Sequence, residues 1–135
     1  MHPNSLLKFR RRLKSLTKRN SGIGYDTLKK RLRYYITGWL SYYRMADMKR
    51  YMSSMDEWYR RRIRCFIWKQ WKRVRTRYAN LMRCGISRST AYCWANTRKS
   101  YWRISKSFLH RALTNASLKQ RHYPSILEIY LRMHS

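Results

Sequence analysis

The sequence predicts an all-α protein, and three observations support this. Only four glycines and two prolines interrupt 135 residues, so few positions would break a helix. Apolar residues recur every three or four positions over long stretches, and no stretch alternates as a strand does. The chain is 44% hydrophobic and 16% aromatic, which is enough apolar material for a buried core. We expect a bundle of three amphipathic helices followed by a smaller lobe of short basic helices.

The first half of the chain has the pattern of these three helices. The first spans about residues 5–19, and a loop at 20–24 follows it. Asp26 provides an N-cap for the second helix, and Asp47 provides one for a third helix over about 48–71. The apolar stripes are Leu6, Phe9, Leu13 and Leu16; Leu28, Leu32, Tyr35, Trp39 and Tyr42 or Tyr43; and Met48, Tyr51, Met52, Met55, Trp58, Tyr59, Ile63 and Phe66. One shared core is expected to contain Leu13, Leu32, Trp39, Met55 and Trp58.

The second half is divided into shorter segments. We therefore expect a three-helix domain at 1–72 and a basic helical lobe at 73–135. Gly85 is expected to stop a helix over 74–84, and Ser87 to cap the helix that follows. The remaining expected elements are a loop with a turn at 96–107, a short helix at 108–115 and a last helix beginning at Pro124.

The charge balance indicates a polyanionic partner. Lys and Arg number 33 against 5 Asp and Glu, for a formal net charge of +28. A compact chain repels itself at that charge, and nucleic acid is the first partner to consider. An acidic membrane surface is the second, but no run approaches the ~18 apolar residues of a membrane-spanning helix. We expect a nucleic-acid partner and no membrane.

The cysteines and the N-terminus indicate a cytoplasmic setting. Cys65, Cys84 and Cys93 make an odd count without a Cys-x-x-Cys pair, so a disulfide framework is not expected. The first sixteen residues mix basic with apolar side chains and lack the apolar core of a signal peptide. A reducing, intracellular location fits both features.

The sequence offers no catalytic, metal or cofactor site. Two-metal phosphoryl transfer needs clustered carboxylates, and Asp56 and Glu57 are adjacent, so on a helix they point about 100° apart. Their expected role is to neutralise neighbouring arginines. No spacing of Cys and His matches a zinc module, and no glycine-rich phosphate loop is present. The acidic residues are Asp26, Asp47, Asp56, Glu57 and Glu128.

The stretch "IWKQWKRVRTR" (67–77) combines two tryptophans with five basic residues. On a continued third helix, Trp68 and Trp71 fall on the side opposite the core stripe. Two interpretations follow. The tryptophans anchor the second lobe against the back of this helix, or they stack on RNA beside arginines that bind phosphate. We favour the first, because Trp is buried far more often than it serves as a stacking surface.

The basic residues off the core stripe are expected to bind phosphate. They recur on every helix, and almost nothing acidic balances them. Trp102 is a third position considered for stacking, beside Trp68 and Trp71. The expected RNA-binding residues are Arg60, Arg61, Arg64, Lys69, Lys72, Arg73, Arg75 and Arg77, with Arg98, Lys99 and Arg103 as a second patch.

Three blocks of the sequence resemble the C-terminal maturase region of group II intron-encoded reverse transcriptases. They are "RLRYYITGWLSYYR" (31–44), "DEWYRRRIRCFIWKQWKR" (56–73) and "NTRKSYWRISKS" (96–107), in the same order and spacing. "LHRALTNASL" (109–118) fits the end of that region. The resemblance implies a polymerase thumb, or X domain, in the first three helices and a D region, implicated in DNA target binding and intron mobility, after them. It also implies that the chain binds intron RNA, assists splicing and, as part of a reverse transcriptase, helps to hold template and primer.

The chain departs from that family in two places and lacks its upstream parts. Ser100 stands where the family often has glycine, and a glycine near His122 is replaced as well. No palm or finger sequence and no Tyr-x-Asp-Asp block is present. We expect a non-enzymatic fragment, a truncated reading frame or an excised domain, whose partners include the remainder of a reverse transcriptase. The alternatives are a generic basic RNA- or DNA-binding module, a non-functional remnant, and a cationic membrane-active chain.

Overall fold

The computed structural model describes residues 3–18, 22–43, 47–98, 101–106 and 108–134. These residues form helices and no strand, which confirms the all-α prediction. The helices are α1 (Pro3–Leu16), α2 (Tyr25–Tyr42), α3 (Lys49–Gln70), α4 (Val74–Arg83), α5 (Arg88–Ala95), α6 (Tyr101–Lys106), α7 (Leu109–Ala112), α8 (Asn115–Gln120) and α9 (Ile126–Met133).

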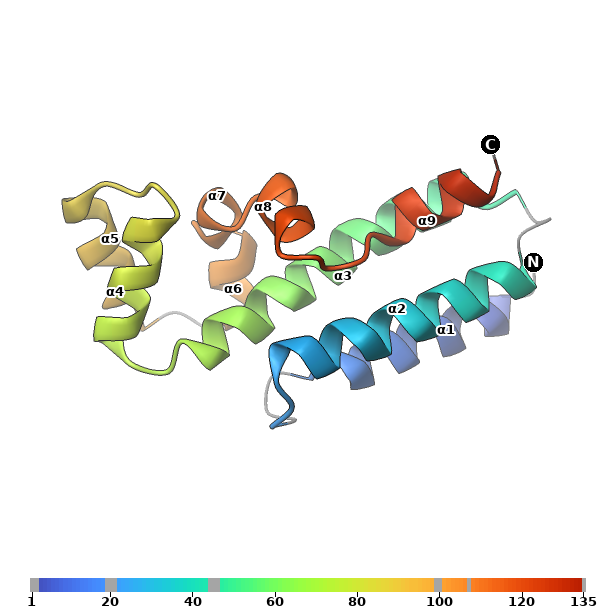
Figure 1. Ribbon diagram of the computed structural model, residues 1–135, viewed down its shortest axis with the longest axis horizontal. Helices are drawn as coiled ribbons and strands as arrows, with labels where there is room; N and C mark the ends of the chain where they lie inside the picture. The colour runs from blue at the N-terminus through green and yellow to red at the C-terminus, as the bar shows by residue number, and fades with distance from the viewer. Residues whose placement is uncertain (1–2, 19–21, 44–46, 99–100, 107, 135) are drawn as a thin grey trace.

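The long helix α3 runs between the α1–α2 pair and the helices of the C-terminal part (Figure 1). Helices α1 and α2 pack together beside one end of it, and α9 returns to the same end and contacts both α2 and α3. Helices α6 and α7 contact α3 along its other half. Helices α4 and α5 pack on each other at the far end of the molecule. Helix α3 therefore packs directly against α1, α6, α7 and α9.

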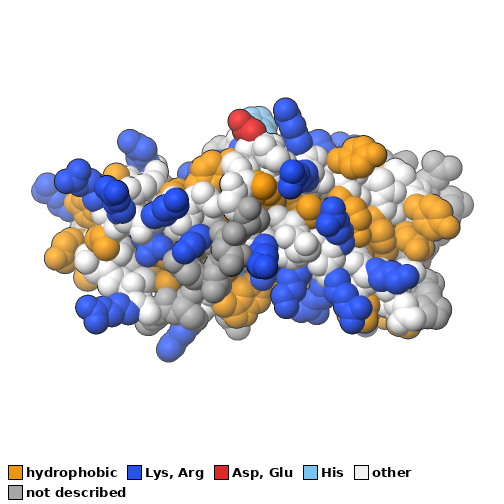
Figure 2. Space-filling view, turned by 90° about the horizontal axis from the view of Figure 1, so that it is seen from below, with side chains coloured by type: hydrophobic (Ala, Val, Ile, Leu, Met, Phe, Trp, Pro, Cys, Tyr) orange, Lys and Arg blue, Asp and Glu red, His pale blue; other side chains and the backbone are white. Residues whose placement is uncertain are grey.

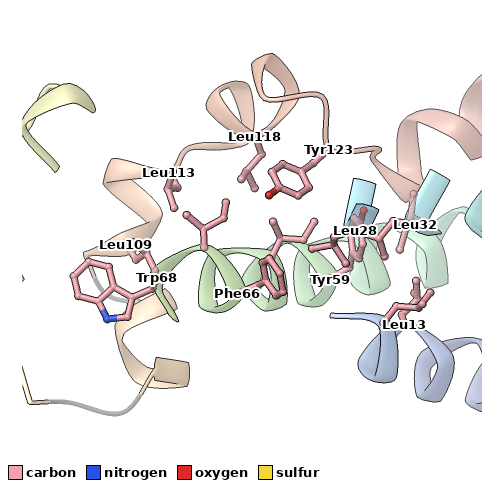
Figure 3. Packing of buried hydrophobic residues seen from close by; sticks show 14 of the residues in the cluster. Leu13, Leu28, Leu32, Tyr59, Phe66, Trp68, Leu109, Leu113, Leu118 and Tyr123 are labelled. Atoms are coloured by element: carbon pink, nitrogen blue, oxygen red, sulfur yellow. The ribbon is translucent and has the colours of Figure 1, made fainter. Parts of the chain in front are cut away.

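The core follows the length of α3 (Figure 3). At one end Leu13 and Leu32 are fully buried, and at the other end Trp68 lies against residues of the second half. The five residues expected to share a core all belong to this cluster: Leu13 and Leu32 are buried, and Trp39, Met55 and Trp58 are partly buried against it. The stripe predicted for the first helix is confirmed by the burial of Phe9, Leu13 and Leu16.

The stripe predicted for the second helix was partly wrong. Ile36 and Leu40 are buried on α2, together with the predicted Leu28 and Leu32. Trp39 lies at the margin, stacked on Phe9 with ring centroids 4.2 Å apart. Ile36 and Leu40 are fully buried, whereas a large aromatic side chain such as Trp39 gains much of its burial at the edge of a core.

Helix α9 joins the first half of the chain in space. Ile126, Ile129 and Tyr130 are buried, and the Met48 backbone N–H donates to the Tyr130 hydroxyl oxygen at 2.8 Å. That bond satisfies a donor at the start of α3, where the helix itself offers no acceptor. The division of the chain at residue 72 stays a prediction, and α9 contacts α2 and α3 across it.

The short elements of the second half differ in detail from the prediction. A helix, α6, occupies part of the expected loop at 96–107, and the expected helix at 108–115 is divided between α7 and α8. Gly85 does stop α4, with a left-handed φ of 88°. His122 ends α8 in the same way, with a φ of 68°. The departure near His122 thus coincides with a conformation that favours glycine.

Candidate nucleic-acid interface

Basic side chains are spread over much of the face shown in Figure 2, and acidic atoms appear only at its edge. Several of the predicted binding residues nevertheless lie in two stretches of the sequence. We call the predicted Arg60, Arg61 and Arg64 of α3, together with their neighbour Arg62, which was not predicted, the arginine row. Lys72, Arg73 and Arg75 after α3 are the basic run.

Arg60 is held by the buried carboxylate of Asp56. Its Nη2 lies 2.9 Å from Asp56 Oδ2 and donates to the Ser125 hydroxyl at 3.0 Å. Asp56 also accepts hydrogen bonds from Ser125 Oγ at 3.0 Å and from the Ile126 N–H at 2.9 Å, so it caps the start of α9. Burial raises the pKa of Asp56, while Arg60 and the Ser125 hydrogen bond lower it. The expected neutralising role of Asp56 is confirmed, and the capping role adds to it.

Arg64 lies in the interior, where an exposed face was expected. Only 4% of the residue is exposed. Its Nε donates to the Leu113 carbonyl at 2.6 Å, and its Nη2 donates to Asn115 Oδ1 at 2.8 Å. Burial, and then the charge of Arg60, lowers its pKa to about 10, so it remains protonated at neutral pH. The far side of α3 is covered by the second half of the chain, which helical spacing alone does not reveal.

Trp68 joins α3 to the second half, as the favoured interpretation predicted, and Trp71 is buried beside it with ring centroids 6.1 Å apart. Trp68 is fully buried, and its ring meets Phe108 edge-on with centroids 5.6 Å apart. Trp71 is 5% exposed. Neither ring offers a face to a base in this arrangement, so a stacking role for either would require the core to open.

Arg77 closes the end of α3. Its Nε donates to the Trp71 carbonyl at 2.7 Å and its Nη2 donates to the Trp68 carbonyl at 3.3 Å. Its guanidinium carbon lies 4.4 Å from the Trp68 ring centroid. A cation at a helix C-terminus satisfies orphan carbonyls and complements the helix dipole. Arg77 therefore has a structural task that the sequence did not indicate.

The basic run is exposed. Lys72, Arg73 and Arg75 lie in the turn after α3 and at the start of α4, with Lys69 half-buried just before them. Arg98 and Arg103 of the second patch are also exposed, and Lys99 lies outside the described residues. Charges in these positions can approach a phosphate backbone without disturbing the core.

A comparison with protein families decides the identity of the chain. The sequence model of the family described as "Group II intron, maturase-specific domain" matches residues 6–85. The chain belongs to this family. The matched span runs from α1 through α4 and contains the basic run, whereas Arg98 and Arg103 lie beyond it. No curated protein matches the sequence.

The maturase-specific domain has further basic residues that the sequence reasoning did not select. Arg11, Lys14 and Lys18 of the α1 region share a hollow with Arg62 and Trp102. Their positions off the apolar stripe were the only signal for them. A charge off the stripe is usually no more than a solvated side chain, so that signal does not distinguish them.

Two carboxylates of the chain form ion pairs, Asp56 in the interior and Glu128 on the surface. Asp56 is engaged with Arg60 and α9, and Glu128 lies 3.4 Å from Lys119 Nζ. Within the described residues, no three His, Cys, Asp or Glu side chains come close enough to hold a metal ion. None of the described helices is both long and apolar enough to cross a membrane.

Proposed function

We propose that this maturase-specific domain binds group II intron RNA and stabilises the folded form of the intron that splices. The observation that carries the proposal is the family match over 6–85, which includes the exposed basic run. A net charge of +28 supplies the electrostatic attraction that such binding needs. Binding is proposed to place Lys72, Arg73 and Arg75 against phosphates, with Lys69, Arg98 and Arg103 beside them.

A duplex partner is a second candidate for the same surface. Phosphate contacts position a protein on nucleic acid without reading sequence, so a DNA target or a template-primer duplex would meet the same charges. The family's relation to intron reverse transcriptases favours this role when the rest of such an enzyme is present. We propose that the chain alone catalyses neither polymerisation nor cleavage, and that it acts in the cytoplasm, where its cysteines stay reduced.

The test compares RNAs of equal length. The purified chain is titrated with the intron RNA that surrounds its reading frame and with an unrelated structured RNA, across a range of salt. The proposal expects tighter binding to the intron at every salt concentration. It also expects the chain to raise the spliced fraction of a precursor at a Mg²⁺ concentration where the RNA alone is inactive. Equal affinity for the two RNAs, with no effect on splicing, would contradict the proposal and indicate a generic basic module that binds nucleic acid.

A separate assay addresses catalysis. Nucleotide incorporation on a primed RNA template is measured with the purified chain and Mg²⁺, and none is expected. Asp56 is engaged with Arg60 and α9, and among the described residues no three His, Cys, Asp or Glu side chains come close together, whereas two-metal chemistry needs several carboxylates close together. Incorporation that disappears in Asp56→Asn or Glu57→Gln would contradict this part of the proposal.

A further inference from the structure

Trp102 is held on the surface of α3 by Arg61. The Arg61 guanidinium carbon lies 3.7 Å from the Trp102 ring centroid, a close cation–π contact. The Arg61 Nε and Nη2 also donate to the Trp102 carbonyl oxygen at 3.2 and 2.7 Å. Trp102 still has 37% of its surface exposed, in contrast to the buried Trp68 and Trp71. An indole ring is thus kept in one orientation while part of it faces solvent.

Two basic hollows are both lined by this tryptophan. Their volumes of about 530 and 550 Å³ fall within the range of small-ligand sites, ~300–1,000 Å³. The first hollow is lined by Arg60, Arg61, Arg64, His110, Asn115 and Trp58, with Glu57 as its one acidic lining residue. The second is lined by Arg11, Lys14, Lys18, Arg62 and Thr17, with no acidic residue among those that line it.

The arginines of these hollows are oriented before any ligand arrives. Arg62 donates from Nε to Thr17 Oγ1 at 3.1 Å and from Nη2 to the Lys14 carbonyl at 2.8 Å. In the first hollow, Arg64 is fixed by Leu113 and Asn115. Side chains that are already ordered lose less conformational entropy on binding. Both hollows therefore present positive charge on side chains that are already held in place.

The aromatic ring that they share narrows the class of anion. A free phosphate gains nothing from an indole, whereas a nucleobase stacks on it. In a duplex each base face is covered by its neighbours, so only an unpaired nucleotide can present a face to Trp102. We infer that Trp102 and the two hollows hold an unpaired stretch of nucleic acid, with one base on the indole and its flanking phosphates in the hollows. The inference rests on the proposed RNA binding and specifies which part of the RNA this surface contacts.

The first experiment uses the unmodified chain. A single-stranded oligoribonucleotide of about 12 residues, a length within the ~4–16 nucleotides of typical single-strand sites, carries one 4-thiouridine and is crosslinked by light. The matched probes are a blunt RNA duplex and a single-stranded DNA with 4-thiothymidine. We expect the single strands to crosslink to the peptide that contains Trp102. The yields of the RNA and DNA probes show which sugar the site prefers. Crosslinks confined to α4 and α5 would overturn the inference.

The second experiment uses variants. Trp102→Ala should weaken binding of the single-stranded RNA by about 5- to 150-fold, the loss expected for one stacked base, and leave duplex binding nearly unchanged. Trp102→Phe keeps a ring and should restore most of the affinity. Tyr34→Ala removes an aromatic side chain that is 86% exposed and lines neither hollow, so it is the matched control. Thermal melting of each variant shows whether a loss comes from unfolding.

The outcomes separate this inference from the proposed function. Tight, salt-dependent binding of intron RNA that is insensitive to Trp102 would remove the unpaired-strand site and leave the proposed function intact. An equal loss for single strand and duplex in Trp102→Ala would do the same. Displacement of the single strand by a poly-glutamate peptide at equal charge would show that the hollows accept acidic proteins instead. Failure to bind any RNA would remove the proposed function itself.

Discussion

The arginine row and the basic run differ in what their charges do, although they follow one another in the sequence. In the row, Arg60 holds Asp56 and Arg64 holds Leu113 and Asn115. In the run, Arg73 and Arg75 are exposed. Replacing a buried arginine leaves its former acceptors in the interior without a hydrogen-bond donor. Replacing an exposed arginine leaves only groups that water can solvate. Equal charge in the sequence therefore does not mean equal function.

This difference separates two kinds of mutational effect. Substitutions in the row should change stability first, and substitutions in the run should change nucleic-acid binding alone. The prediction applies to single residues and can be tested with matched pairs on neighbouring positions.

The largest effect is expected for Asp56→Ala. The substitution removes the acceptor for the Ile126 N–H and leaves Arg60 without its carboxylate. Breaking a buried ion pair costs ~3–5 kcal/mol, and we expect about 3 because the Arg60 side chain is 20% exposed and can be rehydrated. Urea unfolding measures the loss. The matched control is Glu57→Ala, an exposed neighbour expected to stay within ~0.5 kcal/mol. A similar cost for both would mean that Asp56 does not cap α9.

Arg64→Ala should come next, at about 2–3 kcal/mol, because hydrogen bonds to charged groups contribute ~1.5–3. The Leu113 carbonyl and Asn115 would lose their donor. The control is Arg73→Ala, which should leave the free energy of unfolding within ~0.5 kcal/mol of the parent. Urea unfolding of the two variants measures the difference in their free energies of unfolding. Unchanged stability in Arg64→Ala would contradict its structural role.

Arg77→Ala should cost about 1–2 kcal/mol, since it removes two hydrogen bonds and a favourable charge at the end of α3. Arg75→Ala, two positions earlier and exposed, should cost no more than ~0.5 kcal/mol. Thermal melting of both variants gives the comparison. A melting temperature of Arg77→Ala equal to that of Arg75→Ala would place Arg77 in the basic run.

The long helices could be predicted because their information is local. The stripe of α1 follows helical spacing, and Leu13 and Leu32 were placed in the core correctly. The stripe for α2 was partly wrong because Trp39 was placed in it for its large apolar ring. The structure buries Ile36 instead and leaves Trp39 at the margin of the core. The packing of α9 onto α2 and α3 could not be predicted from the sequence. Contacts such as that between Asp56 and Ile126 join residues far apart in the chain, and they produce no repeating pattern of apolar residues.

The exposure of the expected binding residues could be predicted only in part, for the same reason. The density of charge selected Arg73 and Arg75, which the structure shows to be exposed. It also selected Arg64 and Arg77, because a helical wheel shows which way a residue points and not what covers it. The hollow around Arg62 was missed, since it forms only when the α1 region, α3 and Trp102 meet in space.

The central claim is that the basic run binds the phosphates of group II intron RNA. The most direct measurement is the slope of log affinity against log salt for the intron RNA, in the parent chain and in the triple variant with Lys72, Arg73 and Arg75 changed to Ala. Each lost phosphate contact lowers the slope by ~0.7–0.9, so the variant should be flatter by about two to three units, with an unchanged free energy of unfolding. An unchanged slope in a folded triple variant would contradict the claim.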